Sequence, residues 1–555
     1  MTDLVMRPPE QVMTLSRLGS LHQCRLSFMR QLLRRMRREN WQITRPRFDI
    51  SMRGEGVAVY TAQGPTRAYS LVAFAHDLPD EMRSDRVIAT AWDATFTLFD
   101  GIPTEQDIER LRANVPLQEA GRVSEKELSL SRANRSARLW DYVVDCLAKG
   151  EQPDTEELAN VGYLMRTTAV YGSGKFGASD RAFVGARSEF EAPFQVEMLS
   201  VYLTRAFVAD LVEHMAALKE PDAAVPLAPA LRRSLGIGNS TGLGMAPFLV
   251  NHPRLLNNWI MAREYALAKI RALPRATLSE ITAFKTAFEK ARASVALWRS
   301  DHPIQQAKLA ALGNDICALE KKLRSFNGAE DAPWNALYLW AEGALSEEGQ
   351  ELVVSLLMEP HGAVLEGLGA CMQADEHALF RIDGAMPLST LKSLIKTHYA
   401  WALATDWHSH DASARLWYVS ESKLEPRLGE RFEEPLEPYE QPLAPGRDAA
   451  FLFAALNETD HSTVAAFLVA HPEHRHIVRR VQMAPSHPYA EIRDNTIGAD
   501  MKPIDMLRAK LSFFGATHFD PRSDRWVRIN MFRGAPYPHE LAHDQDDTWV
   551  YGAAR

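Results

Sequence analysis

The change from strand-like to helical periodicity after residue 101 is the feature that most constrains the fold. Four β-rich runs lie between residues 41 and 101, and Gly54, Gly56 and Gly64-Pro65 separate them. In the last run, 87–99, large apolar residues recur at every second position, as in a strand with one buried face. This pattern predicts an antiparallel meander.

Helical spacing of apolar residues dominates the rest of the chain. It predicts helices at 104–114, 124–149, 154–166, 193–219, 247–273, 276–299 and 302–326. Beyond residue 330 the pattern is mixed, with helices expected at 333–358, 387–403, 447–457, 461–470 and 473–483, and strands at 378–382, 415–419 and 524–532. The proline-rich segment 425–447 predicts an extended loop or linker.

These patterns predict a predominantly helical α+β protein with a small N-terminal antiparallel sheet, a helical core and a mixed α/β C-terminal region. A chain of 555 residues is long for a single core, so we expect several regions. They are 1–101, with an N-terminal helix and the meander, 102–330, a helical core with glycine-rich loops, and the mixed region 331–555. The long amphipathic helices predict a homo-oligomer, a dimer.

Composition excludes several classes of protein. A net charge of −8 argues against general binding of nucleic acid, which requires a basic face. No apolar run approaches the length of a membrane span, and no secretory signal is visible, so we expect no membrane association and a cytoplasmic location. The four cysteines are far apart and form no CxxC pair, which is typical of reduced thiols: Cys24, Cys146, Cys317 and Cys371.

The segment 28–38 predicts a basic amphipathic helix. Phe28, Leu32 and Met36 fall on one face of it, and five arginines occupy other positions. Such a helix lies either on a membrane surface or against the body of the protein or a partner subunit. The second arrangement is favoured.

A glycine-punctuated stretch at 236–248 is the best indication of a site. Glycines allow close approach of the backbone, and a helical pattern follows directly. A loop at a helix N-terminus presents N–H groups and a positive dipole end, which favour an anion. The spacing fits neither a P-loop nor a dinucleotide fingerprint. The alternative is a plain helix–loop–helix connection without a ligand. If the stretch forms a site, we expect these residues to bind substrate: Gly238, Asn239, Ser240, Thr241, Gly242 and Gly244.

A second glycine cluster at 166–177 places Lys175 among three glycines, with Gly174 beside it and Arg166 upstream. A lysine in such a loop holds a carboxylate or phosphate, or acts as a base when its pKa is lowered. We therefore expect Arg166 and Gly174 to bind substrate and Lys175 to assist catalysis. A solvated turn with a charged tip is the alternative, and the sequence leaves open whether the two glycine clusters meet.

The polar segment 486–500 supplies the third set of candidates. His487 or Glu491 is expected to transfer a proton, and Arg493 to clamp a carboxylate, with Asn495 nearby. A polar loop that satisfies its own hydrogen bonds is the alternative interpretation.

Two histidine clusters, at 408–410 and 471–476, raise the question of a metal, but no established metal-binding motif is present and we expect none. Together these features predict a cofactor-independent lyase or hydrolase acting on a small carboxylate or phosphate. One alternative is a nucleotide- or flavin-dependent enzyme that uses the 236–244 glycine loop. The other is a non-catalytic helical protein that forms an oligomer or binds a partner.

Overall fold

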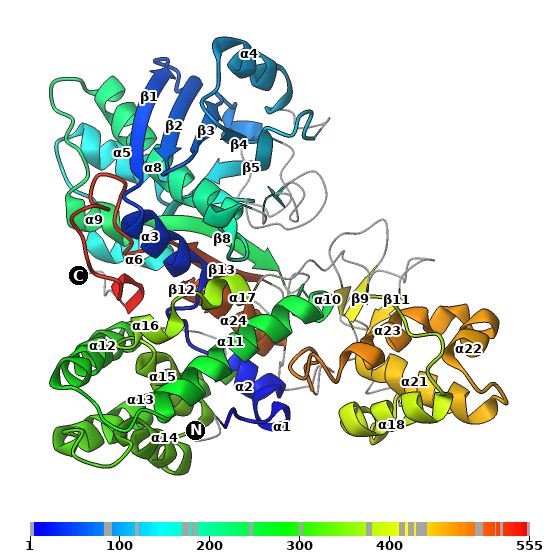
Figure 1. Ribbon diagram of the computed structural model, residues 1–555. Coiled ribbons are helices and arrows are strands. Elements are labelled where there is room, and N and C mark those ends of the chain that lie inside the picture. Colours follow the sequence, from blue (N-terminus) through cyan, green and yellow to red (C-terminus); the bar gives the residue numbers. More distant parts are fainter. Residues whose placement is uncertain are drawn as a thin grey trace.

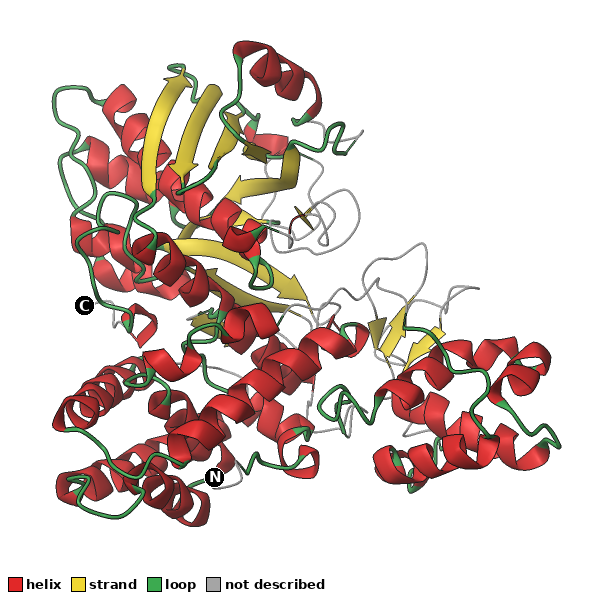
Figure 2. Cartoon of the chain, in the orientation of Figure 1, coloured by secondary structure: helices red, strands yellow, loops and turns green. Residues whose placement is uncertain are grey.

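The computed structural model combines one large sheet with many helices (Figure 2). This confirms a predominantly helical α+β protein. The structure describes residues 5–82, 91–116, 121–168, 177–178, 184, 187–242, 248–298, 303–372, 380–409, 417–419, 427–428, 441–493, 503–516, 518–521 and 526–551.

The main sheet has ten strands and draws on most of the chain, so the prediction of a small N-terminal sheet is confirmed only in part: the N-terminal strands are one end of a larger sheet. Its order is β1-β2-β3-β4-β5-β6-β8-β13-β12, with β7 paired to β5. Neighbours are antiparallel except β6 and β8, which are parallel. The strands are β1 (Gln42–Ile50), β2 (Gly56–Gln63), β3 (Ala68–Ala75), β4 (Ala94–Asp100), β5 (Glu127–Arg135), β6 (Tyr163–Thr167), β7 (Gly177–Ala178), β8 (Gly236–Gly242), β12 (His518–Pro521) and β13 (Trp526–Met531).

The predicted meander is confirmed as β1 to β4, but two predicted helices contain strands. Residues 124–149 hold β5 followed by α5 (Trp140–Ala148), and 154–166 hold α6 (Thr155–Val161) followed by β6. In β5, Ser129 and Ser131 occupy the buried face opposite that of Leu130, which weakens the apolar alternation. Gly162 ends α6 in the left-handed conformation, and β6 begins at the next residue.

Several predicted helices are confirmed, notably those at 104–114, 193–219, 276–299 and 302–326. The remaining helices of the large body are α1 (Pro9–Val12), α2 (Leu15–Gly19), α3 (Phe28–Arg38), α4 (Glu105–Asn114), α8 (Gln195–Lys219), α9 (Pro229–Ser234), α10 (Phe248–Asn251), α11 (Pro253–Arg271), α12 (Leu278–Ala296), α13 (Pro303–Ser325), α14 (Pro333–Ala344), α15 (Glu347–Leu357), α16 (Gly362–Leu365), α17 (Leu368–Cys371) and α24 (Pro503–Phe514), with 3₁₀ turns η1 (Asp80–Met82), η2 (Ser188–Phe190) and η6 (Trp549–Tyr551).

The two faces of the meander have different covers. The long helix α8 packs on one face, where Phe207 meets the rings of Tyr60 and Phe96 edge-on. The short helix α4 covers part of the opposite face, where Ile108 and Leu111 join a smaller cluster with residues of β2 to β5. The part of that second face beyond α4 carries polar side chains, described below.

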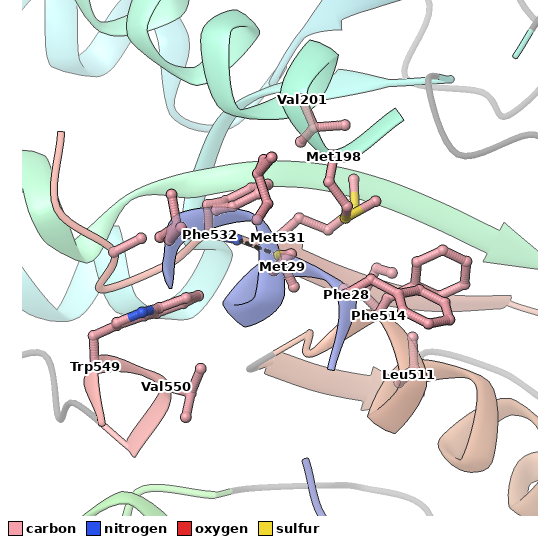
Figure 3. Packing of buried hydrophobic residues seen from close by; sticks show 14 of the residues in the cluster. Phe28, Met29, Met198, Val201, Leu511, Phe514, Met531, Phe532, Trp549 and Val550 are labelled. Atoms are coloured by element: carbon pink, nitrogen blue, oxygen red, sulfur yellow. Dashed lines mark hydrogen bonds between the residues drawn. The ribbon is translucent and has the colours of Figure 1, made fainter. Parts of the chain in front are cut away.

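Helix α3 packs into the body, as favoured from its sequence. Figure 3 shows Phe28 and Met29 among Met531, Phe532 and other apolar residues of the large core. The apolar face of α3 is therefore used inside the protein. Among the helices that the structure describes, none has an apolar stretch long enough to cross a membrane.

Buried ion pairs tie the N-terminal segment to the helical part of the core. The Arg7 guanidinium donates to Glu264 of α11 and to Glu351 of α15, and Arg263 also donates to Glu351. Arg17 of α2 donates to the same Glu351 carboxylate at 2.9 Å. One carboxylate thus contacts three guanidinium groups.

A second, smaller core lies within the predicted region 331–555, whereas helices at both ends of that region belong to the large core. Figure 1 shows this helical unit at the right of the molecule, next to a three-stranded sheet. It comprises α18 (Leu388–His398), α19 (Ala400–Leu403), α21 (Pro445–Glu458), α22 (Val464–Ala470), η5 (Pro472–His474) and α23 (Arg475–Met483), beside β9 (Trp417–Val419), β10 (Arg427–Leu428) and β11 (Gln441–Leu443). The described residues 380–382 form no strand, so that part of the predicted strand 378–382 was wrong.

Candidate functional site

The glycine-punctuated stretch begins as a strand, so the expected loop was wrong for residues 236–242. The whole of β8 lies in the sheet, and residues 237–242 pair with β13. Backbone groups of this segment are used in the ladder, which limits their capacity to bind an anion. Helix α9 precedes the strand, while Gly244 lies outside the described residues.

Close packing of strands explains two of these glycines. A Cβ on Gly238 would lie 2.5 Å from the ring of Tyr163, and a Cβ on Gly236 would lie 2.5 Å from the carbonyl oxygen of Met531. Any larger residue at either position would collide with its neighbour. The glycines thus have a structural role whether or not a ligand binds nearby.

The parallel pairing of β6 and β8 brings the starts of the two glycine clusters to one edge of the sheet. Arg166 in β6 lies opposite Gly238 in β8. The chain leaves both strands at their carboxyl ends, which share an edge because the strands are parallel. Gly174 and Lys175 lie outside the described residues, so Arg166 is the one of these three expected site residues that the structure describes.

Arg166 shares one sheet face with a second arginine, Arg132 of β5. In the register, Asn134 lies opposite Arg166, and Arg132 lies two residues from Asn134 on the same strand. Because side chains alternate along a strand, all three occupy the same face. We call this set, together with Thr95 opposite Arg132, the arginine face.

The two arginines of the arginine face are shielded from solvent to different extents. Burial lowers the pKa of Arg132 to about 10, and its guanidinium lies 5.0 Å from the centre of the Trp92 ring. The Arg166 side chain is buried, with 8% of its surface exposed. The Asn134 amide accepts from the N–H of Asp93 and donates to the carbonyl of Ala91, which fixes the adjoining segment.

His76 lies at the edge of this face, and the sequence analysis missed it. Its Nε2 is 2.9 Å from Thr95 Oγ1, and its backbone N–H donates to the carbonyl of Asp93. Burial lowers the pKa of His76, although the carboxylates of Glu55 and Asp93 partly oppose the shift. The imidazole is therefore neutral near pH 7 and able to accept a proton.

Asn239 is the second predicted residue whose side chain is informative. It is buried in β8 with 2% of its surface exposed. Its Oδ1 has no hydrogen-bond partner among the residues that the structure describes. A buried amide oxygen without a donor is costly, so this position favours a bound water or ligand group. For Ser240, Thr241 and Gly242 the structure describes only the pairing of their backbone with β13.

The third candidate set lies elsewhere and has structural partners. Glu491 accepts both guanidinium bonds of Arg480 and the hydroxyl bond of Tyr399. Arg493 pairs with Glu10, and its N–H donates to the carbonyl of Met13. These described partners come from the second core and the N-terminal segment rather than from the arginine face.

His487, the other expected proton carrier, lies with its Nδ1 2.8 Å from Ser486 Oγ. Burial, and secondarily the charge of Arg254, lower the pKa of His487. Its backbone N–H donates to the carbonyls of Met483 and Ala484 at the end of α23. Asn495 lies outside the described residues.

The histidine clusters have other partners where the structure describes them. His471 and His474 stack on Phe467, and His476 Nε2 is 3.0 Å from Asp448 Oδ2. Within the described part of the chain, no group of three or more His, Cys, Asp or Glu residues is arranged to hold a metal ion.

A signal for Arg132 is present in the sequence. Leu130 and Arg132 occupy alternate positions, so a cation follows an apolar residue on the same face of β5, whereas a register shift puts Leu128 in the opposite core. A half-buried arginine in such a position indicates either a partner or a ligand. His76 has no comparable signal, because only the pairing of β3 with β4 brings it next to Thr95.

Known proteins give no guide to the function of this chain, so the function has to be inferred from the geometry described above. No family model, no curated protein and no solved structure matches the chain.

Proposed function

We propose that the protein is a lyase or hydrolase that acts on a small carboxylate or phosphate and holds its anionic group between Arg132 and Arg166. The observation that carries this proposal is the register of β5, β6 and β8. It places a buried guanidinium, that of Arg166, and a half-buried one, that of Arg132, on one face, where the two glycine clusters leave the sheet. The anionic substrate expected from the sequence is retained, with a different set of residues.

Guanidinium groups suit this role because their planar fork matches a carboxylate or phosphate. Burial strengthens such an interaction, since less water competes for the charges. Donors that are already fixed in place also stabilise negative charge that develops during bond breaking. The ring of Trp92 and the segment fixed by Asn134 hold Arg132 in position for this.

We assign His76 as the proton carrier. Its neutral imidazole lies beside Thr95, which is opposite Arg132 in the register. If His76 acts as a base, activity is lost as the pH falls through its lowered pKa, because the protonated ring cannot accept a proton. A His76→Gln variant should lower kcat by about 10²–10⁴-fold with little change in KM.

The first test is binding, because it needs no knowledge of the reaction. Titration calorimetry with inorganic phosphate and with succinate should detect binding that weakens about 10–100-fold in Arg132→Gln. Arg132→Lys keeps the charge but loses the fork, so it should restore only part of the affinity.

Arg112→Gln is the matched control. Arg112 also lies over an aromatic ring, that of Phe74, on the same side of the sheet, but its side chain is 42% exposed. It should leave binding unchanged. Equal affinity in wild type and Arg132→Gln, with both proteins folded, would contradict the proposed site.

A further inference from the structure

A groove next to α3 has an arginine-rich lining. Its volume is about 710 Å³, within the range of small-molecule sites. Helix α3, the turn before α8, the α16–α17 segment and the C-terminal segment enclose it. Its charged lining residues are Arg25, Arg34, Arg35, Arg37, Arg38, Glu191 and Glu366. Cations thus outnumber anions on its wall.

Two carboxylates behind the groove, Glu359 and Asp547, pair with arginines at its base, but neither forms an ion pair with Arg37. Arg25, Arg30 and Arg34 all lie within 3.7 Å of the same Asp547 carboxylate. Burial, together with the charges of Arg25 and Arg30, lowers the pKa of Arg34 to about 10 despite Asp547. Crowded guanidinium groups repel each other, and a further anion would relieve this repulsion.

Arg37 is the most informative residue of the groove. Its Nε and Nη2 are buried and have no hydrogen-bond partner, and the described residues contain no ion pair to it. Its neighbours Arg35 and Arg38, by contrast, pair with Glu191 and Glu366. Arg37 as a whole is half-buried, and its charge acts on Asp547 without forming an ion pair. Buried N–H groups without an acceptor are costly unless a ligand provides one.

We propose that this groove binds the di- or triphosphate group of a small ligand, as in a nucleoside triphosphate or inorganic triphosphate. Several guanidinium groups on adjacent turns of one helix match several phosphate groups in a row. This site is distinct from the arginine face, and it does not depend on the proposed reaction.

A small ligand fits better than a polymer. The walls come from four segments, including Ala542 and Gln545 near the C-terminus, so the arginines lie in a groove rather than on an open basic surface. The net charge of −8 further disfavours a nucleic acid, whose long backbone needs an extended basic face.

The test is titration of the full-length protein with inorganic triphosphate, ATP and a short single-stranded RNA. We expect the first two to bind and to weaken as salt rises, because charges dominate the interaction. Equal affinities for inorganic triphosphate and ATP would show that the protein recognises the phosphates alone. Tighter binding of ATP would show that the groove also contacts the nucleoside. RNA binding much more tightly than either would overturn the proposal.

Two variants locate the site. Arg37→Gln removes the guanidinium, and Ala370→Glu adds a carboxylate at an exposed position of the lining, where folding is not at risk. Each should weaken triphosphate binding at least about tenfold. The control is Ala283→Glu, the same change at an exposed position of α12 outside the lining.

Wild-type affinity in both groove variants, or no binding of triphosphate by wild type, would overturn the proposal. The Arg132→Gln variant distinguishes the triphosphate site from the proposed catalytic function. This variant should bind triphosphate normally even where it loses phosphate or succinate.

Discussion

Two clusters of buried arginines in this protein differ in their supply of carboxylates. In the first, Arg7, Arg17 and Arg263 surround Glu351, and Glu264 adds a second carboxylate. In the second, along the groove of α3, Arg25, Arg30 and Arg34 share Asp547, Arg30 also pairs with Glu359, and Arg37 has no hydrogen bond or ion pair among the described residues. Every guanidinium of the first cluster has an ion pair, whereas Arg37 in the second has none among the described residues.

This difference indicates two roles for the same side chain. A guanidinium that is fully paired links distant segments, as Arg7 links the N-terminal segment to α11 and α15. A guanidinium without a partner contributes little to folding but is ready for a ligand. Natural sites commonly sacrifice stability in this way.

The largest expected effect is the loss of the shared carboxylate. Glu351→Gln leaves three guanidinium groups without their common anion in a site where Glu351 is fully buried. We expect the free energy of unfolding to fall by about 3–5 kcal/mol, measured by urea denaturation. Glu347→Gln is the control, because this carboxylate is 42% exposed and lies 3.6 Å from Arg17, and it should cost about 0–1 kcal/mol. A similar loss of unfolding free energy in Glu351→Gln and Glu347→Gln would show that the buried ion pairs around Glu351 do not stabilise the fold as proposed.

Acid should weaken the same cluster. Contacts with Arg7 and Arg263 lower the pKa of Glu351 below its ordinary value of 4.5, although burial opposes them. Its contribution is therefore present above pH 4.5 and is lost as the pH falls through the folded-state pKa. Denaturation at a series of pH values should show that the wild type loses on the order of 2 kcal/mol more than Glu351→Gln on acidification. Parallel pH curves would contradict this assignment.

The smallest effect is expected in the groove. Arg37→Met removes a half-buried cation that has no hydrogen bond or ion pair among the described residues, so the free energy of unfolding should stay within about 1 kcal/mol of wild type or rise. Arg30→Met, seven residues earlier on α3, removes the partner of the buried Glu359 and should cost about 3–5 kcal/mol. Thermal and urea denaturation without ligand compare the two. A large loss in Arg37→Met would assign Arg37 to the structure rather than to a ligand.

Local pattern was sufficient where glycines separate β-rich runs or where apolar residues recur at helical spacing. The meander β1–β4 and the long helices α8, α12 and α13 were predicted for this reason. It failed for β5 and β6, whose buried positions include polar side chains such as Ser129, Ser131 and Arg166. In these strands the residue type that a position tolerates depends on its contacts across the sheet, so Ser129 and Ser131 can occupy buried positions in place of apolar residues.

The candidate site shows the same limit. Arg166, Gly238 and Asn239 were identified from the glycine clusters, and the structure places the first two opposite each other. Arg132 and His76 were missed, because only strand register brings them to that face. The expected roles of Glu491 and Arg493 stay predictions, and both side chains have close partners in the fold.

The sequence by itself determined the α+β class, the main helices, the meander and the basic amphipathic character of α3, because periodicity and charge are local properties. Tertiary structure alone decided that β6 and β8 are parallel neighbours, that Arg132 and Arg166 share a face, and which arginines find a carboxylate. Pairing between residues such as Arg7 and Glu351 depends on how distant segments meet, and no local pattern encodes the arrival of a partner more than 300 residues away.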